Sequence, residues 1–90
     1  MNTLHILNSP LSGTELAAQF ALFGANDSVI FIQDGCYTLA NSSAIADKVN
    51  LYALEDDLKA RNITCPDSVK VLDYPGFVDL TLAHHKTISW

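Results

Sequence analysis

Cys36 is the side chain of this sequence with the strongest claim to covalent chemistry. It directly follows Asp34-Gly35, at the expected start of a helix, where the positive end of the helix dipole lowers the pKa of a thiol and favours the nucleophilic thiolate. Asp34 opposes this effect because it holds a negative charge nearby. Free cysteines also commonly fill small apolar slots in protein cores. Both interpretations of Cys36 stand at this point.

The second cysteine, Cys65, precedes Pro66 in an expected loop and has a weaker claim to chemistry. The two cysteines lie far apart in the sequence and form no C-x-x-C pair. This spacing argues against a disulfide framework and against a zinc knuckle. We therefore expect two free thiols.

The three histidines do not have the spacing of a zinc site. His84 and His85 are adjacent, so on a helix they point about 100° apart instead of sharing one face as an i, i+4 pair does. His5 lies in an expected strand, where a hydrogen-bonded core histidine is more common than a metal ligand. We predict no metal site.

Two polar segments are candidates for ligand binding. Residues 9–14, Ser-Pro-Leu-Ser-Gly-Thr, lie between the first expected strand and helix, where α/β folds bind phosphate, but they lack both G-x-x-x-x-G-K-[ST] and G-x-G-x-x-G. Hydroxyls that cap the helix explain this segment better. The carboxylates of residues 55–57 could hold a hard cation, but consecutive residues diverge around a helix, and acidic residues at a helix start complement its dipole. We predict no cofactor.

Three aromatic residues near the end of the sequence, Tyr74, Phe77 and Trp90, are candidates for an interface. Aromatic side chains dominate binding energy when they fill desolvated pockets, and a small sheet offers little core in which to bury all of them. Ordinary core packing is the alternative, especially for Phe77, which lies on the inward stripe of its helix. Trp90 has no following chain to bury it, so it folds back onto the domain or fills a pocket on a partner. We favour the partner for Trp90.

The composition is that of one globular domain, residues 1–90. Apolar residues make up 49% of the chain and charged residues 17%, which leaves more apolar surface than a small core needs and favours oligomerisation. The net charge of −5 excludes the basic surface expected for direct contact with nucleic acid or an anionic membrane. No apolar run is long enough for a membrane span, and no cationic segment precedes the first apolar residues, so we expect a cytoplasmic protein.

Four short apolar runs, each followed by turn-forming residues, are the expected strands: residues 4–7, 29–32, 51–54 and 69–72. Their nearly continuous apolar character is typical of parallel strands that are covered on both faces. Helical patterns separate the runs: 12–24, a second after Gly35 whose end stays open, an optional short helix at 44–47, then 55–62 and a last helix after Pro75. This alternation predicts a small α/β domain with a mainly parallel four-stranded sheet between layers of helices.

Five blocks spread over the whole chain resemble the DsrH/TusB family of sulfur-relay proteins. They occur in the order and spacing of that family over a matching length, and the final Ser-Trp is the most distinctive of them. The blocks are LHILNSP (4–10), QDG (33–35), LYALEDDLKAR (51–61), LDYPGFVDLT (72–81) and SW (89–90).

The resemblance implies a flavodoxin-like fold of the DsrE/F/H type and a part in a cytoplasmic sulfur relay. TusB-like proteins assemble with homologous TusC-like and TusD-like subunits into a heterohexamer, with two copies of each, that passes persulfide sulfur toward 2-thiouridine at the tRNA wobble position. In that complex the sulfur-accepting cysteine belongs to the TusD-like subunit. We therefore expect a non-catalytic structural subunit, in which Cys36 fills a core slot and is dispensable.

Three alternatives accompany this interpretation. Cys36 could itself carry a persulfide, as a sulfurtransferase would, provided that its thiol ionises. The chain could instead belong to a DsrEFH-type relay of sulfur oxidation, in which some DsrH relatives carry a cysteine on the first helix. The corresponding segment here is Ala18-Gln19-Phe20, and its lack of a cysteine favours the tRNA role. In isolation the chain could also form a homodimer.

Overall fold

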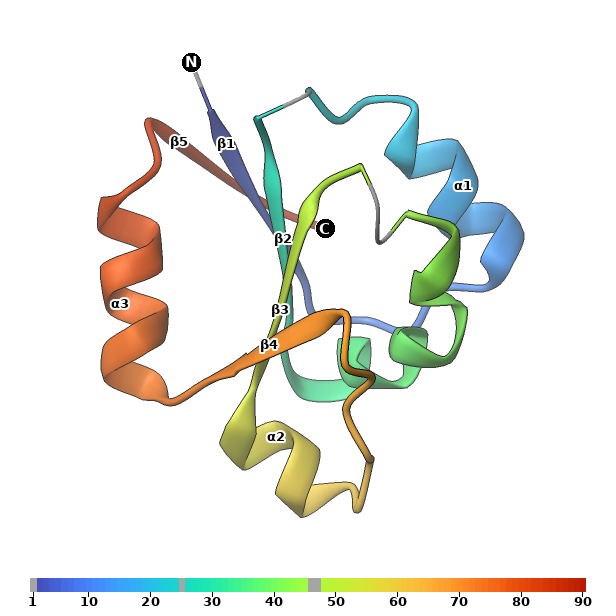
Figure 1. Ribbon diagram of the computed structural model, residues 1–90. Coiled ribbons are helices and arrows are strands. Elements are labelled where there is room, and N and C mark those ends of the chain that lie inside the picture. The colour runs from blue at the N-terminus through green and yellow to red at the C-terminus, as the bar shows by residue number, and fades with distance from the viewer. Residues whose placement is uncertain (1, 25, 46–47) are drawn as a thin grey trace.

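The sheet of this protein contains five parallel strands in the order β4-β3-β2-β1-β5 (Figure 1). The computed structural model describes residues 2–24, 26–45 and 48–90. The strands are β1 (Thr3–Leu7), β2 (Ser28–Phe31), β3 (Asn50–Leu54), β4 (Val69–Leu72) and β5 (Lys86–Ser89). The helices are α1 (Gly13–Phe20), the 3₁₀ helix η1 (Gln33–Ala44), α2 (Glu55–Ala60) and α3 (Tyr74–Leu82). Within the described ranges, no helix has both the length and the apolarity needed to cross a bilayer.

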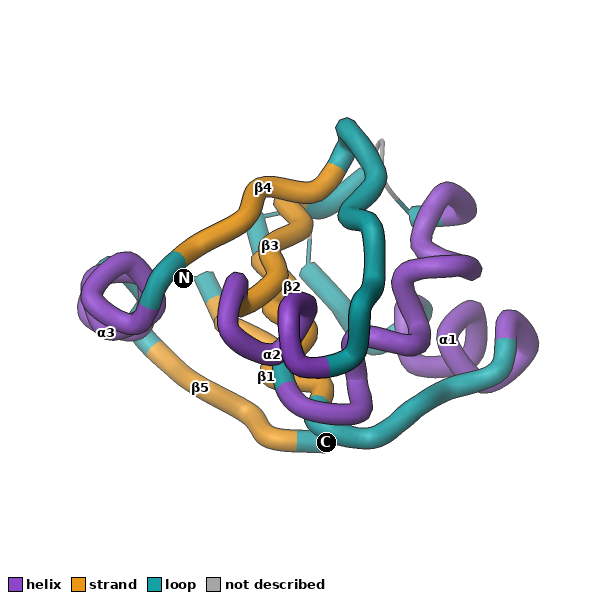
Figure 2. Tube along the Cα trace, turned by 90° about the horizontal axis from the view of Figure 1, so that it is seen from below, coloured by secondary structure: helices purple, strands orange, loops and turns teal. Residues whose placement is uncertain are grey.

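The order of the strands decides which face of the sheet each helix covers. From β1 to β4 the chain moves one strand at a time in one direction, so right-handed crossovers place α1, η1 and α2 on the same side. We call this side, which carries Val29, Phe31 and Leu51, the front face. The helix α3 connects β4 at one edge with β5 at the other, so the same handedness places it on the opposite back face. Figures 1 and 2 show α3 across the sheet from α1, and the predicted three-layer α/β fold is confirmed.

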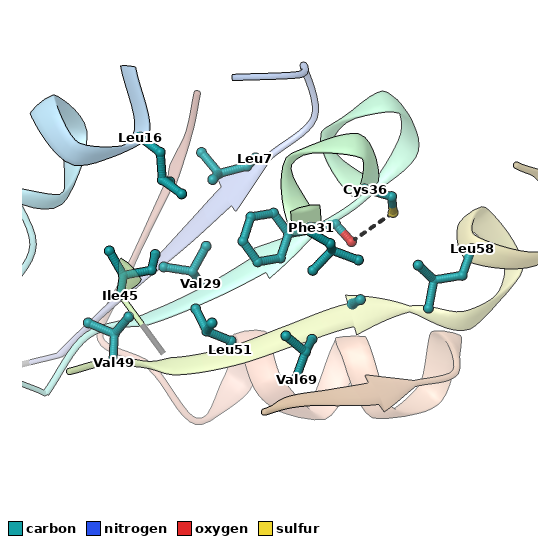
Figure 3. Packing of buried hydrophobic residues seen from close by; sticks show 12 residues of the cluster. Leu7, Leu16, Val29, Phe31, Cys36, Ile45, Val49, Leu51, Leu58 and Val69 are labelled. Atoms are coloured by element: carbon teal, nitrogen blue, oxygen red, sulfur yellow. Dashed lines mark hydrogen bonds between the residues drawn. The ribbon is translucent and has the colours of Figure 1, made fainter. Parts of the chain in front are cut away.

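The hydrophobic core lies between the front face and its helices (Figure 3). Alternate strand residues such as Val29, Phe31 and Leu51 point into it, and Leu16 of α1 and Leu58 of α2 close it from the other side. These five side chains are at most 5% exposed, and each stabilises the fold by about 1.5–3 kcal/mol through leaving water. The back face also buries Leu4 and Ile30, but α3 contributes no buried residue of its own.

Local sequence signals set where two of the helices begin. The Oγ atom of Ser12 accepts a hydrogen bond from the N–H of Glu15 at 3.1 Å, and the Glu15 carboxylate accepts one from the N–H of Ser12 at 3.2 Å. This confirms that a hydroxyl in the segment after β1 caps a helix. Asp73 caps α3 in a similar way, because its carboxylate accepts from the N–H of Gly76 at 2.8 Å.

The structure differs from the sequence-based description in three places. The sheet has five strands instead of four, because the segment of β5 contains a single apolar residue, Ile88, and gives no strand pattern. The helix α1 ends at Phe20, before Gly24, and turns that are hydrogen-bonded to its last residues follow. The second helix is a 3₁₀ helix that extends to Ala44. The optional short helix at 44–47 falls partly on residues 46 and 47, outside the described ranges.

Candidate functional site

Cys36 lies in the first turn of η1 and is fully buried, with 0% of its surface exposed. Its thiol donates a hydrogen bond to the backbone carbonyl of Phe31, with 3.5 Å between sulfur and oxygen (Figure 3). Burial raises the pKa of the Cys36 thiol to about 11, and the negative charges of Asp57 and Asp34 contribute to the increase. At neutral pH the thiol therefore stays protonated, and a protonated thiol is a poor nucleophile.

A pocket of about 250 Å³ opens beside Cys36, between η1 and the loop that leads to β4. The second thiol, Cys65, lies in the same loop and is half-buried. Burial raises its pKa as well, and the charge of Asp67 adds to the increase. The residues that line the pocket are mainly apolar: Cys36, Tyr37, Leu39, Ala40, Ile63, Thr64 and Pro66. The charge of Arg61 lowers the pKa of Cys36, but burial and Asp57 outweigh it, so neither thiol is activated as a nucleophile.

Glu55 and Asp57 in the acidic run at the start of α2 contact different groups. Glu55 accepts a hydrogen bond from the Lys59 ammonium at 2.7 Å. Asp57 accepts one from the N–H of Gln33 at 2.8 Å, and its other oxygen lies 3.7 Å from the guanidinium of Arg61. Because these carboxylates point to different groups, they do not converge on one ion.

The carboxyl ends of β1 and β2 are closed by the start of η1. Open α/β sheets commonly bind ligands at this edge. A Cβ atom on Gly35 would lie 1.9 Å from the carbonyl oxygen of Leu7, so glycine is required for this close approach. The N–H of Ile32 donates to the same carbonyl at 3.0 Å. The backbone of Gln33 in the preceding turn is in the left-handed region, with a φ of 49°, which non-glycine residues rarely adopt. The backbone of η1 therefore packs directly against the end of β1.

The histidines near the end of α3 point to separate partners. The Nδ1 atom of His84 donates to the carbonyl of Leu80 at 2.7 Å, and its Nε2 atom lies 3.0 Å from the hydroxyl of Ser28. The Nδ1 atom of His85 lies 2.8 Å from the side-chain oxygen of Asn2. Among the residues that the structure describes, no three His, Cys, Asp or Glu side chains come together in a group that could hold a metal ion.

His5 is buried on β1 and belongs to a chain of hydrogen bonds. Its Nε2 atom lies 2.7 Å from Oδ2 of Asp27, and the indole N–H of Trp90 donates to its Nδ1 atom at 3.0 Å. Burial by itself raises the pKa of Asp27, but hydrogen bonds from His5 and from the N–H groups of Gly24 and Thr3 outweigh burial and lower it. The prediction of a hydrogen-bonded core histidine is confirmed. Its partners could not be predicted because they lie 22 and 85 residues away in the sequence.

The three aromatic interface candidates lie in different environments. Tyr74 is exposed at the start of α3, and Phe77 is half-buried on the same helix. Trp90 folds back onto the domain, where its ring stacks on His5 with 5.9 Å between centroids and lies 6.4 Å from the ring of Phe23. A role of the three candidates in an interface stays a prediction.

The sequence analysis missed an exposed apolar stripe on α3. Tyr74, Val78 and Leu82, which we call the α3 stripe, are 54%, 54% and 79% exposed. They are four residues apart, so they share one side of the helix. Val71 at the end of β4 is also exposed. The spacing is visible in the sequence, but the sequence alone does not tell whether this side of the helix faces the sheet or solvent.

Both the sequence and the fold are similar to those of known proteins. The sequence profile of a family described as "DsrH like protein" matches residues 8–87. A relative named "Protein TusB" from Photorhabdus laumondii is 38% identical over 79 residues, which cover 77% of this chain and 80% of the relative. A protein of the same name from Serratia proteamaculans is 37% identical over 94 residues, covering 97% and 99%. The ychN protein from E. coli has a TM-score of 0.71 over 99% of this chain and 97% of that chain, at 12% identity, which shows similarity of fold alone.

Proposed function

The chain belongs to the DsrH family, and we propose that it is a non-catalytic structural subunit of a cytoplasmic sulfur relay. In this role it assembles with TusC-like and TusD-like subunits into a heterohexamer with two copies of each. It holds these subunits while they pass persulfide sulfur toward 2-thiouridine at the tRNA wobble position. The relatives named Protein TusB, which match most of the chain, support this assignment.

The observation that carries the non-catalytic role is the state of the two thiols. Accepting sulfur from a persulfide requires a thiolate that a donor can reach. Cys36 is fully buried with a pKa raised to about 11, and the pKa of Cys65 is raised too. On α1, the positions where some DsrH relatives carry a cysteine hold Ala18, Gln19 and Phe20. The chain thus offers no activated thiol among its described residues.

The α3 stripe supports a role in assembly. Exposed apolar side chains that gather on one helix of a small domain mark a surface that a partner can cover. The stripe runs from Tyr74 to Leu82 on a single nine-residue helix. One element of a partner that packs along this helix is therefore sufficient to bury it. The net charge of −5 provides no surface complementary to tRNA, which agrees with contact to the RNA through other subunits.

A persulfide carrier that uses Cys36 is the second candidate, and the pocket beside Cys36 favours it. The pocket could admit a small sulfur donor to the neighbourhood of the thiol. The thiol would still have to break its hydrogen bond to Phe31 and lose a proton at a pKa of about 11. This cost makes the structural role the better supported one.

Reconstitution with sister subunits tests the proposal. The chain is co-expressed with its TusC-like and TusD-like neighbours, the mass of the particle is measured by light scattering, and labelled sulfur is followed from a persulfide donor to tRNA. We expect Cys36→Ser and Cys65→Ser particles to keep both the wild-type mass and the wild-type transfer rate. Replacing the acceptor cysteine of the TusD-like subunit is the matched control and should abolish transfer.

Two results would contradict the structural role. One is a Cys36→Ser particle of normal mass that no longer transfers sulfur, which would identify Cys36 as a carrier. The other is full transfer by the two sister subunits when this chain is left out. Transfer to an acceptor of sulfur oxidation, and not to tRNA, would instead assign the relay to the DsrEFH type.

A further inference from the structure

A chain of hydrogen bonds links Trp90, which follows β5, to Asp27, which precedes β2, through His5 of β1. The indole N–H can only donate, so the Nδ1 atom of His5 must accept and carries no proton. The Nε2 atom of His5 therefore carries the proton and donates to Asp27 Oδ2 at 2.7 Å. The arrangement requires a neutral His5.

The Asp27 carboxylate accepts two further hydrogen bonds, both from backbone N–H groups. Its Oδ1 atom accepts from the N–H of Thr3 at 3.0 Å, and its Oδ2 atom accepts from the N–H of Gly24 at 2.8 Å. These bonds favour the ionised carboxylate. Within this chain of hydrogen bonds, the lone pair of His5 Nδ1 is therefore the site at which a further proton can bind.

The strand β5 is held by its ladder to β1 and by the contacts of Trp90. It is an edge strand that pairs with β1 alone, and Ile88 is its one residue that is not exposed. Beyond its end, the N–H of Trp90 donates to the carbonyl of Ile6 at 2.8 Å. The Trp90 ring packs on His5 and Phe23. Removing the Trp90 ring from this site would leave β5 with its ladder to β1 and the contacts of one apolar side chain.

We propose that His5 acts as a proton-operated latch for β5. A proton that binds Nδ1 of His5 takes the lone pair that accepts the Trp90 hydrogen bond, so two N–H donors then face each other. No other bond forms or breaks, and the imidazolium stays paired with Asp27, which stabilises its charge. Trp90 turns away, and β5 then keeps only its ladder to β1 and the contacts of Ile88.

The other charged groups on the elements that pack around His5 have their own contacts. Lys86 on β5 is exposed. Glu15 on α1 accepts from the N–H of Ser12, and the Lys48 ammonium lies 5.7 Å from the centroid of the Phe20 ring. Asp27 is the charged group that is hydrogen-bonded to His5, so its carboxylate is the charge that most directly stabilises a protonated His5.

Fluorescence of the full chain tests the latch directly, because Trp90 is its single tryptophan. As the pH falls from 8 to 5, we expect the emission of Trp90 to shift to longer wavelength and acrylamide quenching to increase, with unchanged far-ultraviolet circular dichroism. His5→Gln should abolish the response, because an amide can accept from Trp90 and donate to Asp27 without titrating. His84→Gln is the matched control and should respond as the wild type does.

An unchanged Trp90 emission in the wild type over this pH range would overturn the latch. So would a response that persists in a folded His5→Gln variant. If that variant does not fold, proton NMR of the wild type decides: the indole N–H of Trp90 and the ring protons of His5 must titrate with one midpoint. Separate midpoints would also overturn the proposal.

Discussion

On the front face of the sheet, α1, η1 and α2 close over a continuous apolar cluster, whereas on the back face α3 crosses the sheet alone (Figure 2). The front cluster includes Leu16, Phe31 and Leu58. The back face buries Leu4 and Ile30 of the central strands, but α3 contributes no buried residue of its own. The same sheet is therefore packed to different degrees on its two sides.

The front face is packed within the chain, whereas α3 on the back face keeps apolar side chains exposed to solvent. Apolar groups stabilise an isolated chain in proportion to the area that leaves water, so the front face supplies most of that contribution. The α3 stripe supplies little until a partner covers it. In the assembly proposed above, a sister subunit would bury this surface.

The largest expected effect is on the front face. Phe31→Ala removes a fully buried ring from the centre of the cluster, so we expect the free energy of unfolding to fall by about 3–5 kcal/mol. Urea unfolding followed by circular dichroism measures this loss. A decrease of less than about 1 kcal/mol would show that the front cluster is not the stabilising core.

A smaller but still marked effect is expected at the junction of η1 with the sheet. Gly35→Ala would place a Cβ atom 1.9 Å from the carbonyl oxygen of Leu7, and we expect the backbone shift to cost about 2–3 kcal/mol. Gly13→Ala is the matched control, because its Cβ atom would meet Asn41 at an ordinary 3.9 Å. Equal stabilities of the two variants would contradict the close approach of η1 to β1.

The smallest effect on stability is expected on α3. Leu82→Ser changes a residue that is 79% exposed, so the free energy of unfolding should stay within about 0.5 kcal/mol of wild type. The same change should weaken the complex with the sister subunits, as measured by gel filtration with light scattering. Leu22→Ser, at a comparably exposed leucine that follows α1, should leave the complex intact. If both variants assemble like the wild type, the α3 stripe is not the docking surface.

The strands β1 to β4 could be predicted because each is a nearly continuous apolar run between turn residues. The start of α1 was also visible, since Ser12 is a good N-cap. The last helix was expected after Pro75, but Asp73 caps it and it begins at Tyr74. The strand β5 was missed because its residues are mostly polar, and it forms only through pairing with β1. Edge strands of this kind carry little periodic signal of their own.

The candidate site was less predictable than the fold. The position of Cys36 next to Asp34-Gly35 was evident from the sequence. The sequence did not show whether the helix dipole lowers the pKa of its thiol or burial raises it. Burial prevails because η1 packs directly onto the front face. The hydrogen-bond partners of His5, Asp27 and Trp90, lie in distant parts of the chain, so no local sequence pattern could predict them.

The sequence by itself determined the α/β class, the four main strands and the family, because these depend on residue types and on spacing along the chain. Tertiary structure alone decided that Cys36 is buried, that Trp90 lies against His5, and that the α3 stripe faces outward. Each of these depends on which distant segments a right-handed crossover brings together, and such contacts leave no trace in the local pattern of residues.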